Sequence, residues 1–295
     1  MKKLLLILNP CAGRRRANEH LEEIQDIFTQ AGYEVTLHIT QGPGDAVEIL
    51  GTLGQTMDLV VCCGGDGTFN ETVNGLMHHG LQIPVGYIAC GSTNDFAASL
   101  QLPKNILDAA RAIAQGQPAS HDIGHADDRY FSYVASFGAF TRSSYATSQK
   151  AKNALGFFAY FCSGVIEAFR IRSIPIQVKT EEETIDGPFL FGAVSNSTRM
   201  GRVLKLDPKQ VNFSDGKLEM VLIRPPKNPF ELIRCIWQLK KRRYDHRMIV
   251  FRQVESVHFS CPDGTVWTLD GERYDAPEVL HISAQHQAIS LIRKG

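Results

Sequence analysis

Short apolar runs alternate with amphipathic stretches through the first third of the chain. Apolar side chains recur at helical spacing between the runs, as at Leu21, Ile24 and Phe28, and predict helices with one buried face. Strands that alternate with helices predict an α/β fold built on a doubly wound parallel sheet. The predicted strands cover residues 4–8, 35–40, 58–63 and 85–90.

The pattern changes near residue 122, where strand-like alternation replaces the helical spacing. A chain of 295 residues is long enough for two domains. We therefore expect an α/β domain at residues 1–122 and a β-rich, sandwich-like domain at residues 123–295. The apolar stretch at residues 154–166 predicts either a helix that packs between the domains or part of an acyl-chain groove. The later predicted strands cover residues 130–136, 173–180, 188–196, 217–223, 279–284 and 288–292.

Composition narrows the classes of protein that fit. The formal net charge is zero, so no overall positive field favours nucleic acid, and we expect no nucleic-acid partner. The seven cysteines include no C-x-x-C pair, which indicates reduced thiols in a cytoplasmic protein. The apolar run at residues 4–8 is too short for a signal peptide, and no uncharged stretch is long enough to span a bilayer.

A glycine-rich loop, Gly64-Gly65-Asp66-Gly67-Thr68, lies between a predicted strand and a predicted helix. This layout aims backbone N–H groups at phosphate, and glycine leaves no Cβ in the way of a ligand. Asp66 would repel phosphate unless a cation lay between them, so the loop predicts a metal-bound polyphosphate, with ATP and Mg²⁺ as the expected pair. An Asp-Gly hairpin turn is the alternative, but a helix follows rather than a second strand. The spacing of Thr68 and Glu71 predicts a capping box at the start of that helix.

Three further segments follow predicted strands and are expected at the same edge of the sheet, where ligands of such sheets bind. They are residues 9–13, Thr40 and a second glycine loop at residues 91–95. In the second loop, Ser92 and Asp95 again have capping-box spacing. Two glycine loops at one edge strengthen the prediction of a nucleotide site.

Other features near these loops limit the class of nucleotide-binding protein. The run Arg14, Arg15 and Arg16 either neutralises phosphate charge or forms a solvated helix start. The chain has no G-x-x-x-x-G-K-[ST] motif, which excludes a P-loop protein. It also has no G-x-G-x-x-G after the first strand, which disfavours a dinucleotide fold, and no protein-kinase signature.

Three motifs occur in order along the first half: Asn9-Pro10 with Gly13, then Gly64-Gly65-Asp66-Gly67-Thr68-Phe69-Asn70-Glu71, then Gly91-Ser92-Thr93-Asn94-Asp95-Phe96-Ala97. Together they resemble the diacylglycerol kinase catalytic domain, in particular that of the bacterial soluble lipid kinases. The first glycine motif alone is shared with NAD kinases and phosphofructokinases, whereas the combination is specific. The resemblance spans essentially the whole chain.

This resemblance implies a kinase of lipid metabolism and phospholipid biosynthesis. The enzyme would transfer the γ-phosphate of Mg-ATP to the hydroxyl of diacylglycerol or a related lipid. An α/β nucleotide-binding domain is expected to precede a β-rich domain, with ATP between them. The implied cofactor-binding residues are Asn9, Pro10, Cys11, Ala12, Gly13, Thr40, Gly64, Gly65, Asp66, Gly67, Thr68, Phe69, Asn70, Glu71, Ser92 and Thr93.

Acidic residues outside the glycine loops are the other candidate site. From spacing alone, Asp270-Gly271 fits a hairpin turn as well as it fits a site. The resemblance implies that Asp270 or Glu272 accepts the proton of the lipid hydroxyl, and that Asp66 acts in catalysis through Mg²⁺. The sequence does not decide between the two proton acceptors. The resemblance also implies a structural Mg²⁺ at a turn, with its ligands supplied by Asn212, Asp215 and the backbone carbonyl of Lys217.

Two departures from the family pattern lie in the second domain, where the lipid head group is expected to bind. Glycine-rich patterns are replaced at residues 138–142 and 200–202. These departures leave the identity of the lipid acceptor open and leave the nucleotide site intact.

A basic amphipathic segment near residue 240 bears on the partner. Its apolar face is expected to hold Phe230, Ile233, Trp237 and Leu239, and the basic run at residues 240–243 follows. Such a segment suits an anionic bilayer surface, although a solvated helix end has the same pattern. We therefore expect a lipid substrate reached by peripheral contact with the inner face of the membrane. A homodimer is compatible with the sequence, which does not decide the oligomeric state.

Two rival functions remain. A small-molecule kinase similar to NAD kinases shares the loop at residues 64–68, but the second loop and the late Asp270-Gly271-Glu272 favour lipid. A non-catalytic lipid- or nucleotide-binding protein is the other alternative. The retention of Asp66, Thr93 and both late acidic residues together argues against lost catalysis.

Overall fold

The computed structural model describes residues 1–138, 173–200, 204–244 and 247–294. The predictions for residues 139–142, 154–166 and 201–202 lie outside the described residues, as do those for the side chains of residues 14–16. Among the residues that are described, no helix is long and apolar enough to cross a membrane.

A parallel sheet forms the centre of the first half, with the strand order β2-β1-β3-β4. The central strands are apolar and buried because helices cover both faces of a sheet of this kind, whereas the edge strand β2 also contains Glu34, Thr36 and His38. Alternate residues of β1 enter two different cores, Leu5 and Ile7 on one face and Leu4 and Leu6 on the other. The strands are β1 (Lys2–Leu8), β2 (Tyr33–Ile39), β3 (Leu59–Gly64) and β4 (Val85–Ala89).

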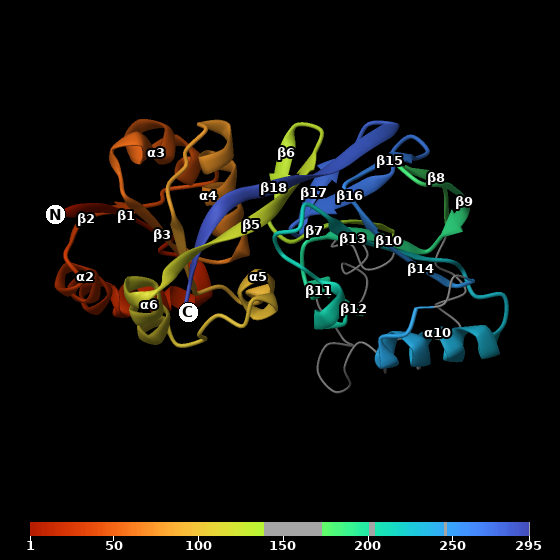
Figure 1. Ribbon diagram of the computed structural model, residues 1–295, viewed down its shortest axis with the longest axis horizontal. Helices are drawn as coiled ribbons and strands as arrows, with labels where there is room; N and C mark the ends of the chain where they lie inside the picture. Colours follow the sequence, from red (N-terminus) through yellow and green to blue (C-terminus); the bar gives the residue numbers. More distant parts are fainter. Residues whose placement is uncertain (139–172, 201–203, 245–246, 295) are drawn as a thin grey trace.

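Helices lie on both sides of this sheet, as a doubly wound fold requires (Figure 1). One pair packs with the core of Leu4 and Leu6, and the other pair packs with the core of Leu5 and Ile7. The first pair is α2 (Leu21–Gln30) and α6 (Ile106–Gln115), and the second is α3 (Asp45–Leu53) and α4 (Asp66–His78). Two short helices complete this half, α1 (Arg16–Glu19) and α5 (Asp95–Ser99).

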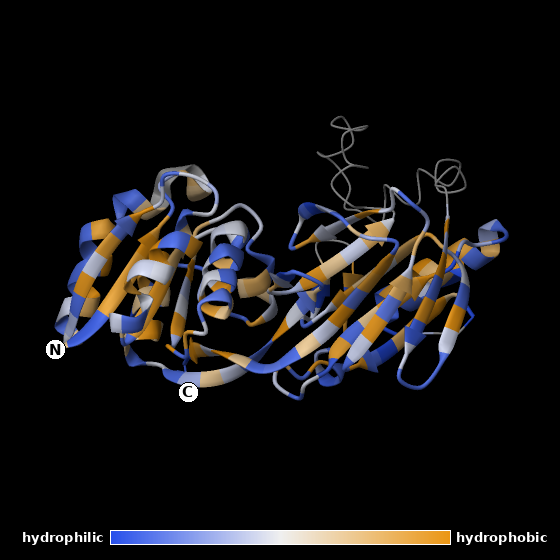
Figure 2. Cartoon of the chain, turned by 90° about the horizontal axis from the view of Figure 1, so that it is seen from above, coloured by the Kyte–Doolittle hydropathy of each residue, from blue (hydrophilic) through white to orange (hydrophobic). Residues whose placement is uncertain are grey.

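An antiparallel sheet dominates the second half, with the strand order β14-β13-β10-β7-β16-β17. The first sheet continues beyond β4 into the second half, in the strand order β18-β15-β8-β9. The inner face of the antiparallel sheet packs against these strands around an aromatic cluster, in which the centre of the Trp267 ring lies 4.8 Å from that of Phe137 and 4.9 Å from that of Phe259. Hydrophobic residues therefore run along the strands of both halves (Figure 2). The strands of the antiparallel sheet are β7 (Val134–Gly138), β10 (Phe191–Ser195), β13 (Leu218–Ile223), β14 (Ile249–Val254), β16 (Val266–Leu269) and β17 (Glu272–Asp275).

Two long strands, β5 and β18, connect the two halves (Figure 1). They pair antiparallel with each other, and the end of β18 pairs with β4 through Leu291 and Val85. An α/β half that leads into a β-sandwich half confirms the predicted fold class, whereas the boundary at residue 122 falls inside β5 and stays a prediction. The remaining elements are β5 (Gln117–Ala126), β6 (Arg129–Phe131), β8 (Ile174–Thr180), β9 (Thr184–Phe189), β11 (Arg199–Met200), β12 (Leu204–Lys205), α10 (Pro229–Lys241), β15 (Ser256–Ser260) and β18 (Val279–Arg293).

Both predicted capping boxes are wrong. Helix α4 begins at Asp66, two residues before Thr68, and Thr68 instead accepts a hydrogen bond from the Asn9 side chain at 2.8 Å. Helix α5 begins at Asp95 after Asn94, which has a φ of 51°, and neither helix has a side-chain cap. The capping positions are occupied by loop residues because the loops bend sharply just before each helix.

Asp122 fixes the place where β5 and β18 cross between the halves. Its carboxylate is fully buried and accepts hydrogen bonds from the backbone N–H of Gln287 at 2.6 Å and of Gly216 at 2.7 Å. Gln287 lies at the irregularity of β18, where the pairing register with β5 shifts and φ is 51°. One side chain therefore holds β5, the bulge of β18 and the turn before β13 together.

We expect Asp122→Ala to lower the free energy of unfolding by about 1–3 kcal/mol, because two backbone N–H groups lose their buried acceptor. Urea unfolding measures this change. Asp108→Ala is the matched control, since Asp108 is exposed on α6 and pairs with Arg111. Equal stabilities of the two variants would contradict the role of Asp122.

Candidate active site

A cavity of about 510 Å³ opens beyond the carboxyl ends of β1, β3 and β4. Loops that follow these strands form its wall, as the position of ligand sites in doubly wound sheets predicts. On the side facing them, Glu272 lines the cavity directly after the turn between β16 and β17. The lining residues are Asn9, Cys11, Ala12, Gly13, Thr40, Gln41, Gly42, Pro43, Gly65, Gly67, Thr68, Glu71, Gly91, Ser92 and Glu272.

Close backbone contacts explain the glycines of the loops. Gly13 has a φ of 54°, and a Cβ there would lie 1.6 Å from the carbonyl oxygen of Cys90. A Cβ on Gly91 would lie 2.7 Å from the Cα of Gly65. The three loops therefore meet backbone to backbone at the edge of the cavity, where side chains larger than hydrogen would not fit.

Asn9 joins the first loop to helix α4. Its side-chain amide donates to the Thr68 hydroxyl at 2.8 Å, and its side-chain carbonyl accepts from the N–H of Cys11 at 2.9 Å. Both polar ends of the Asn9 side chain are thus used within the site. This arrangement holds the first loop against the start of α4.

Asp66 joins the two glycine loops. Its carboxylate accepts from the Thr93 hydroxyl at 3.0 Å and from the N–H groups of Asp95 at 3.1 Å and Phe96 at 3.4 Å. Burial raises the pKa of Asp66, while these donors oppose the rise. The carboxylate therefore lies at the first turn of α4 and against the first turn of α5.

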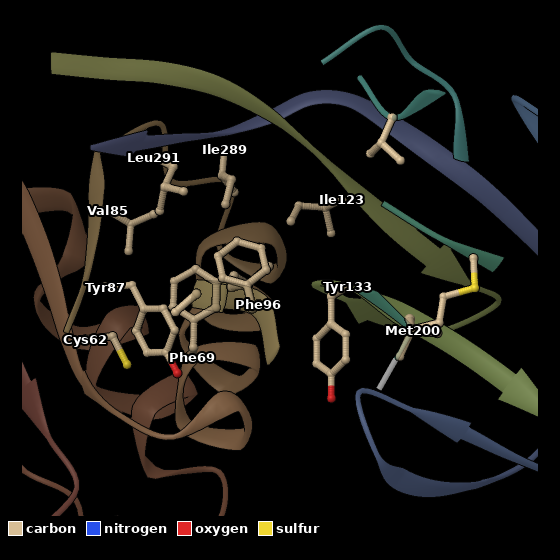
Figure 3. Close-up of a cluster of buried hydrophobic side chains, with 14 of the residues drawn as sticks. Cys62, Phe69, Val85, Tyr87, Phe96, Ile123, Tyr133, Met200, Ile289 and Leu291 are labelled. Atoms are coloured by element: carbon tan, nitrogen blue, oxygen red, sulfur yellow. The ribbon is translucent and has the colours of Figure 1, made fainter. Parts of the chain in front are cut away.

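An aromatic stack supports the loops from behind. The ring of Phe69 lies 4.4 Å from Tyr87 and 4.5 Å from Phe96, and all three are buried (Figure 3). Phe69 belongs to α4, Tyr87 to β4 and Phe96 to α5. Stacked rings of this kind fix the relative positions of the three elements that carry the loops.

Asp270 is buried in the turn between β16 and β17, where it is 7 % exposed. Its carboxylate accepts from the backbone N–H groups of Ser132 at 2.5 Å, Tyr133 at 3.0 Å and Val134 at 3.0 Å. A fourth donor is the side-chain amide of Asn70 on α4, at 2.7 Å. Burial raises the pKa of Asp270 to about 6, although the four donors oppose the rise. The carboxylate is thus occupied on all sides and joins α4 to the second half.

Glu272 is in a different position, at the first residue of β17 and on the wall of the cavity. Its side chain is 50 % exposed, and Arg129 donates to it at 3.3 Å. A Cβ on Gly67 would lie 3.5 Å from Glu272 Oε1, so the carboxylate faces the first glycine loop. Of the two acids left open by the sequence, only Glu272 borders the cavity.

The turn before β13 carries the predicted structural metal ligands. Asn212 accepts from the N–H of Ser214 at 3.3 Å, and Asp215 accepts from the N–H of Lys217 at 3.1 Å. None of the predicted ligands lines the cavity. Within the described part of the chain, no group of three or more His, Cys, Asp or Glu side chains is placed to hold a metal ion. The metal site stays a prediction.

The loop after β2 supplies lining residues that the sequence analysis did not single out. Gln41, Gly42 and Pro43 lie beside Thr40 on the cavity wall. Their position directly after a parallel strand, the same feature that pointed to Thr40, could have predicted them. Glu71 of α4 holds this loop, because its carboxylate accepts hydrogen bonds from the backbone N–H groups of Gly44 and Ala46. Burial raises the pKa of Glu71.

The structure thus divides the predicted site residues into three groups. Those on the cavity wall are Asn9, Cys11, Ala12, Gly13, Thr40, Gly65, Gly67, Thr68, Glu71, Ser92 and Glu272. Those that flank or support the wall are Pro10, Gly64, Asp66, Phe69, Asn70, Thr93 and Asp270. Those at the separate turn before β13 are Asn212, Asp215 and Lys217.

Comparisons with known proteins agree with this geometry. The family model of the diacylglycerol kinase catalytic domain matches residues 3–126. A diacylglycerol kinase of Bacillus subtilis is 30% identical over 92% of this chain and 90% of its own length. One from Staphylococcus carnosus is 29% identical over 92% of this chain and 89% of its own.

Solved structures show the same fold. The crystal structure of a diacylglycerol kinase from Bacillus anthracis superimposes with a TM-score of 0.78 at 20% identity, covering 99% of this chain and 97% of that one. A second solved chain from the same organism superimposes with a TM-score of 0.83 at 22% identity, again with 99% and 97% coverage. These likenesses show the fold, and the 30% identity with the Bacillus subtilis diacylglycerol kinase along 92% of the chain shows that the chain belongs to the diacylglycerol kinase family.

Proposed function

We propose that this protein is an ATP-dependent lipid kinase that transfers the γ-phosphate of Mg-ATP to a lipid hydroxyl. The observation that carries the proposal is the placement of Glu272, which faces the glycine-loop cavity opposite Gly67. Transfer of a phosphoryl group to an alcohol needs a carboxylate opposite the phosphate-binding loop, where it can accept the proton of the attacking hydroxyl.

The cavity fits the nucleotide expected from the sequence. Backbone N–H groups of closely packed glycine loops favour phosphate, and the N-terminus of α4 adds its dipole. Residues 9–13, residues 64–68, Thr40 and Ser92 would hold the nucleotide. Mg²⁺, when bound, supplies the positive charge that neutralises the phosphates, and Asp66 remains the residue we propose to hold it.

Glu272 is the residue that we assign as proton acceptor. The attacking hydroxyl loses its proton in the reaction, and a half-exposed carboxylate on the cavity wall can reach it. The ion pair with Arg129 orients this side chain. Asp270 has no free side on which to receive a lipid, so we assign it to positioning: it holds the turn from which Glu272 projects.

The acceptor is diacylglycerol or a related lipid, since the similar curated proteins are named diacylglycerol kinases. Phosphorylation of such a lipid serves phospholipid biosynthesis. The described cysteines are all free thiols, which supports a cytoplasmic location. Lipid substrates place the enzyme in peripheral contact with the inner face of a membrane.

Glu272→Gln is expected to lower kcat by about 10²–10⁴-fold, the range for loss of a general base. Thermal stability should stay near wild type because Glu272 is half exposed. The matched variant is Asp270→Asn, which should lower the Tm because its amide would face backbone N–H donors instead of accepting from them. Phosphate transfer from ATP to diacylglycerol in mixed micelles, together with thermal denaturation, measures both. A Glu272→Gln enzyme with near wild-type kcat would contradict the assignment.

Asp66→Ala and Asp66→Asn separate two roles of that carboxylate. Asparagine keeps an oxygen that accepts from the Thr93 hydroxyl, but it removes the charge that a metal requires. We expect both variants to lose more than about 100-fold in kcat while remaining folded. Full activity of Asp66→Asn alongside an inactive Asp66→Ala would show that Asp66 serves the loops alone and would contradict the metal role.

A further inference from the structure

Helix α10 presents large apolar side chains to solvent. Phe230 is 83 % exposed, Ile233 62 % and Trp237 51 %. Spacings of three and four residues place them on one side of the helix, which we call the outer face of α10. Elsewhere in the described residues, the exposed large hydrophobic side chains are single ones on separate elements, Met1, Ile39 and Val279.

The opposite side of α10 already secures the helix to the fold. Leu232, Cys235 and Ile236 are buried, and Cys235 joins the core that contains Ile249 of β14. Leu239, which the sequence analysis placed with the exposed side chains, is partly buried against that same core. The outer face therefore contributes little to folding, and its apolar residues need another explanation.

Positive charge surrounds the outer face at its carboxyl end. Lys241, Arg242 and Arg243 are exposed there. Residues 227–247 contain seven Lys or Arg and two acidic residues, within a chain whose formal net charge is zero. Within the described part of the chain, the largest group of exposed apolar side chains thus lies beside a run of exposed basic residues.

We propose that the outer face of α10 docks on an anionic bilayer and holds the kinase at the membrane that contains its substrate. Aromatic and branched apolar side chains enter the headgroup boundary, and Lys and Arg beside them bind anionic lipids. A second copy of the chain is a poor occupant, because a symmetric dimer through this face would bring two basic surfaces together. The inference rests on the proposed function for its substrate and on the exposed residues for its site.

The chain contains its own reporter for this docking. It has two tryptophans, of which Trp267 is fully buried and Trp237 lies on the outer face. Vesicles of phosphatidylcholine with and without phosphatidylglycerol are added without nucleotide. With the anionic vesicles we expect a blue shift of the emission and quenching by brominated acyl chains, and Trp237→Phe should abolish both signals.

Variants test which side chains bind. Phe230→Ser and Ile233→Ser should each weaken vesicle affinity by about tenfold, the cost of leaving such a side chain in water. The double variant Lys241→Gln, Arg243→Gln should bind anionic vesicles about fivefold more weakly for each charge removed. Raised salt should weaken the vesicle affinity of the wild type in the same way. The control is Val279→Ser, which removes an exposed apolar side chain from β18 and should leave affinity unchanged.

Three results would overturn the docking surface: equal binding to neutral vesicles, unchanged affinity in the Phe230 and Ile233 variants, or a wild-type dimer in sedimentation that the same variants dissociate. Wild-type activity on a short-chain diacylglycerol dispersed as monomers is measured separately. Activity without vesicle binding contradicts the docking surface alone, whereas vesicle binding without activity supports it and contradicts the proposed function.

Discussion

The buried carboxylate of Asp270 is the contact on which the candidate site depends. It accepts from three backbone N–H groups, those of the two residues between β6 and β7 and of the first residue of β7, and from the side-chain amide of Asn70 in α4. Helix α4 begins in the first glycine loop, and the turn that contains Asp270 leads directly to Glu272. A single satisfied carboxylate therefore sets the distance between the glycine loops of one half and the proposed base, Glu272, of the other. Its removal would leave several buried donors without a partner.

Carboxylates that accept hydrogen bonds from the backbone of another segment also join other parts of the fold. Asp66 joins the second glycine loop to the first, and Asp122 holds the bulge of β18 against β5. In each case a carboxylate accepts from backbone N–H groups, and these hydrogen bonds align the segments more narrowly than a hydrophobic contact could. Apolar packing supplies the bulk of the stability, as in the stack of Phe69 on Tyr87, and the carboxylates determine which loops touch. The candidate site is thus built by non-local hydrogen bonds on a scaffold of local elements.

This division explains how much the sequence could predict. The parallel strands and their helices followed from apolar runs and helical spacing, because helices cover both faces of the sheet. The cavity edge followed from the order of strands and glycine loops. The sequence could not decide between Asp270 and Glu272, because that choice depends on hydrogen-bond donors far away in the chain, the N–H groups of residues 132–134 and the side chain of Asn70. The two predicted capping boxes failed because Gly65 and Asn94 occupy the N-cap positions of α4 and α5, and because Thr68 accepts a hydrogen bond from Asn9 of another loop.

Nucleotide binding in the cavity and transfer from that nucleotide to a lipid hydroxyl near Glu272 are tested most directly by the fate of γ-labelled phosphate from Mg-ATP. A panel of lipids in mixed micelles is offered beside NAD, a water-soluble acceptor. We expect label in the organic phase, on one lipid of the panel. Label on NAD with none in any lipid, or nucleotide bound with no transfer at all, would contradict it.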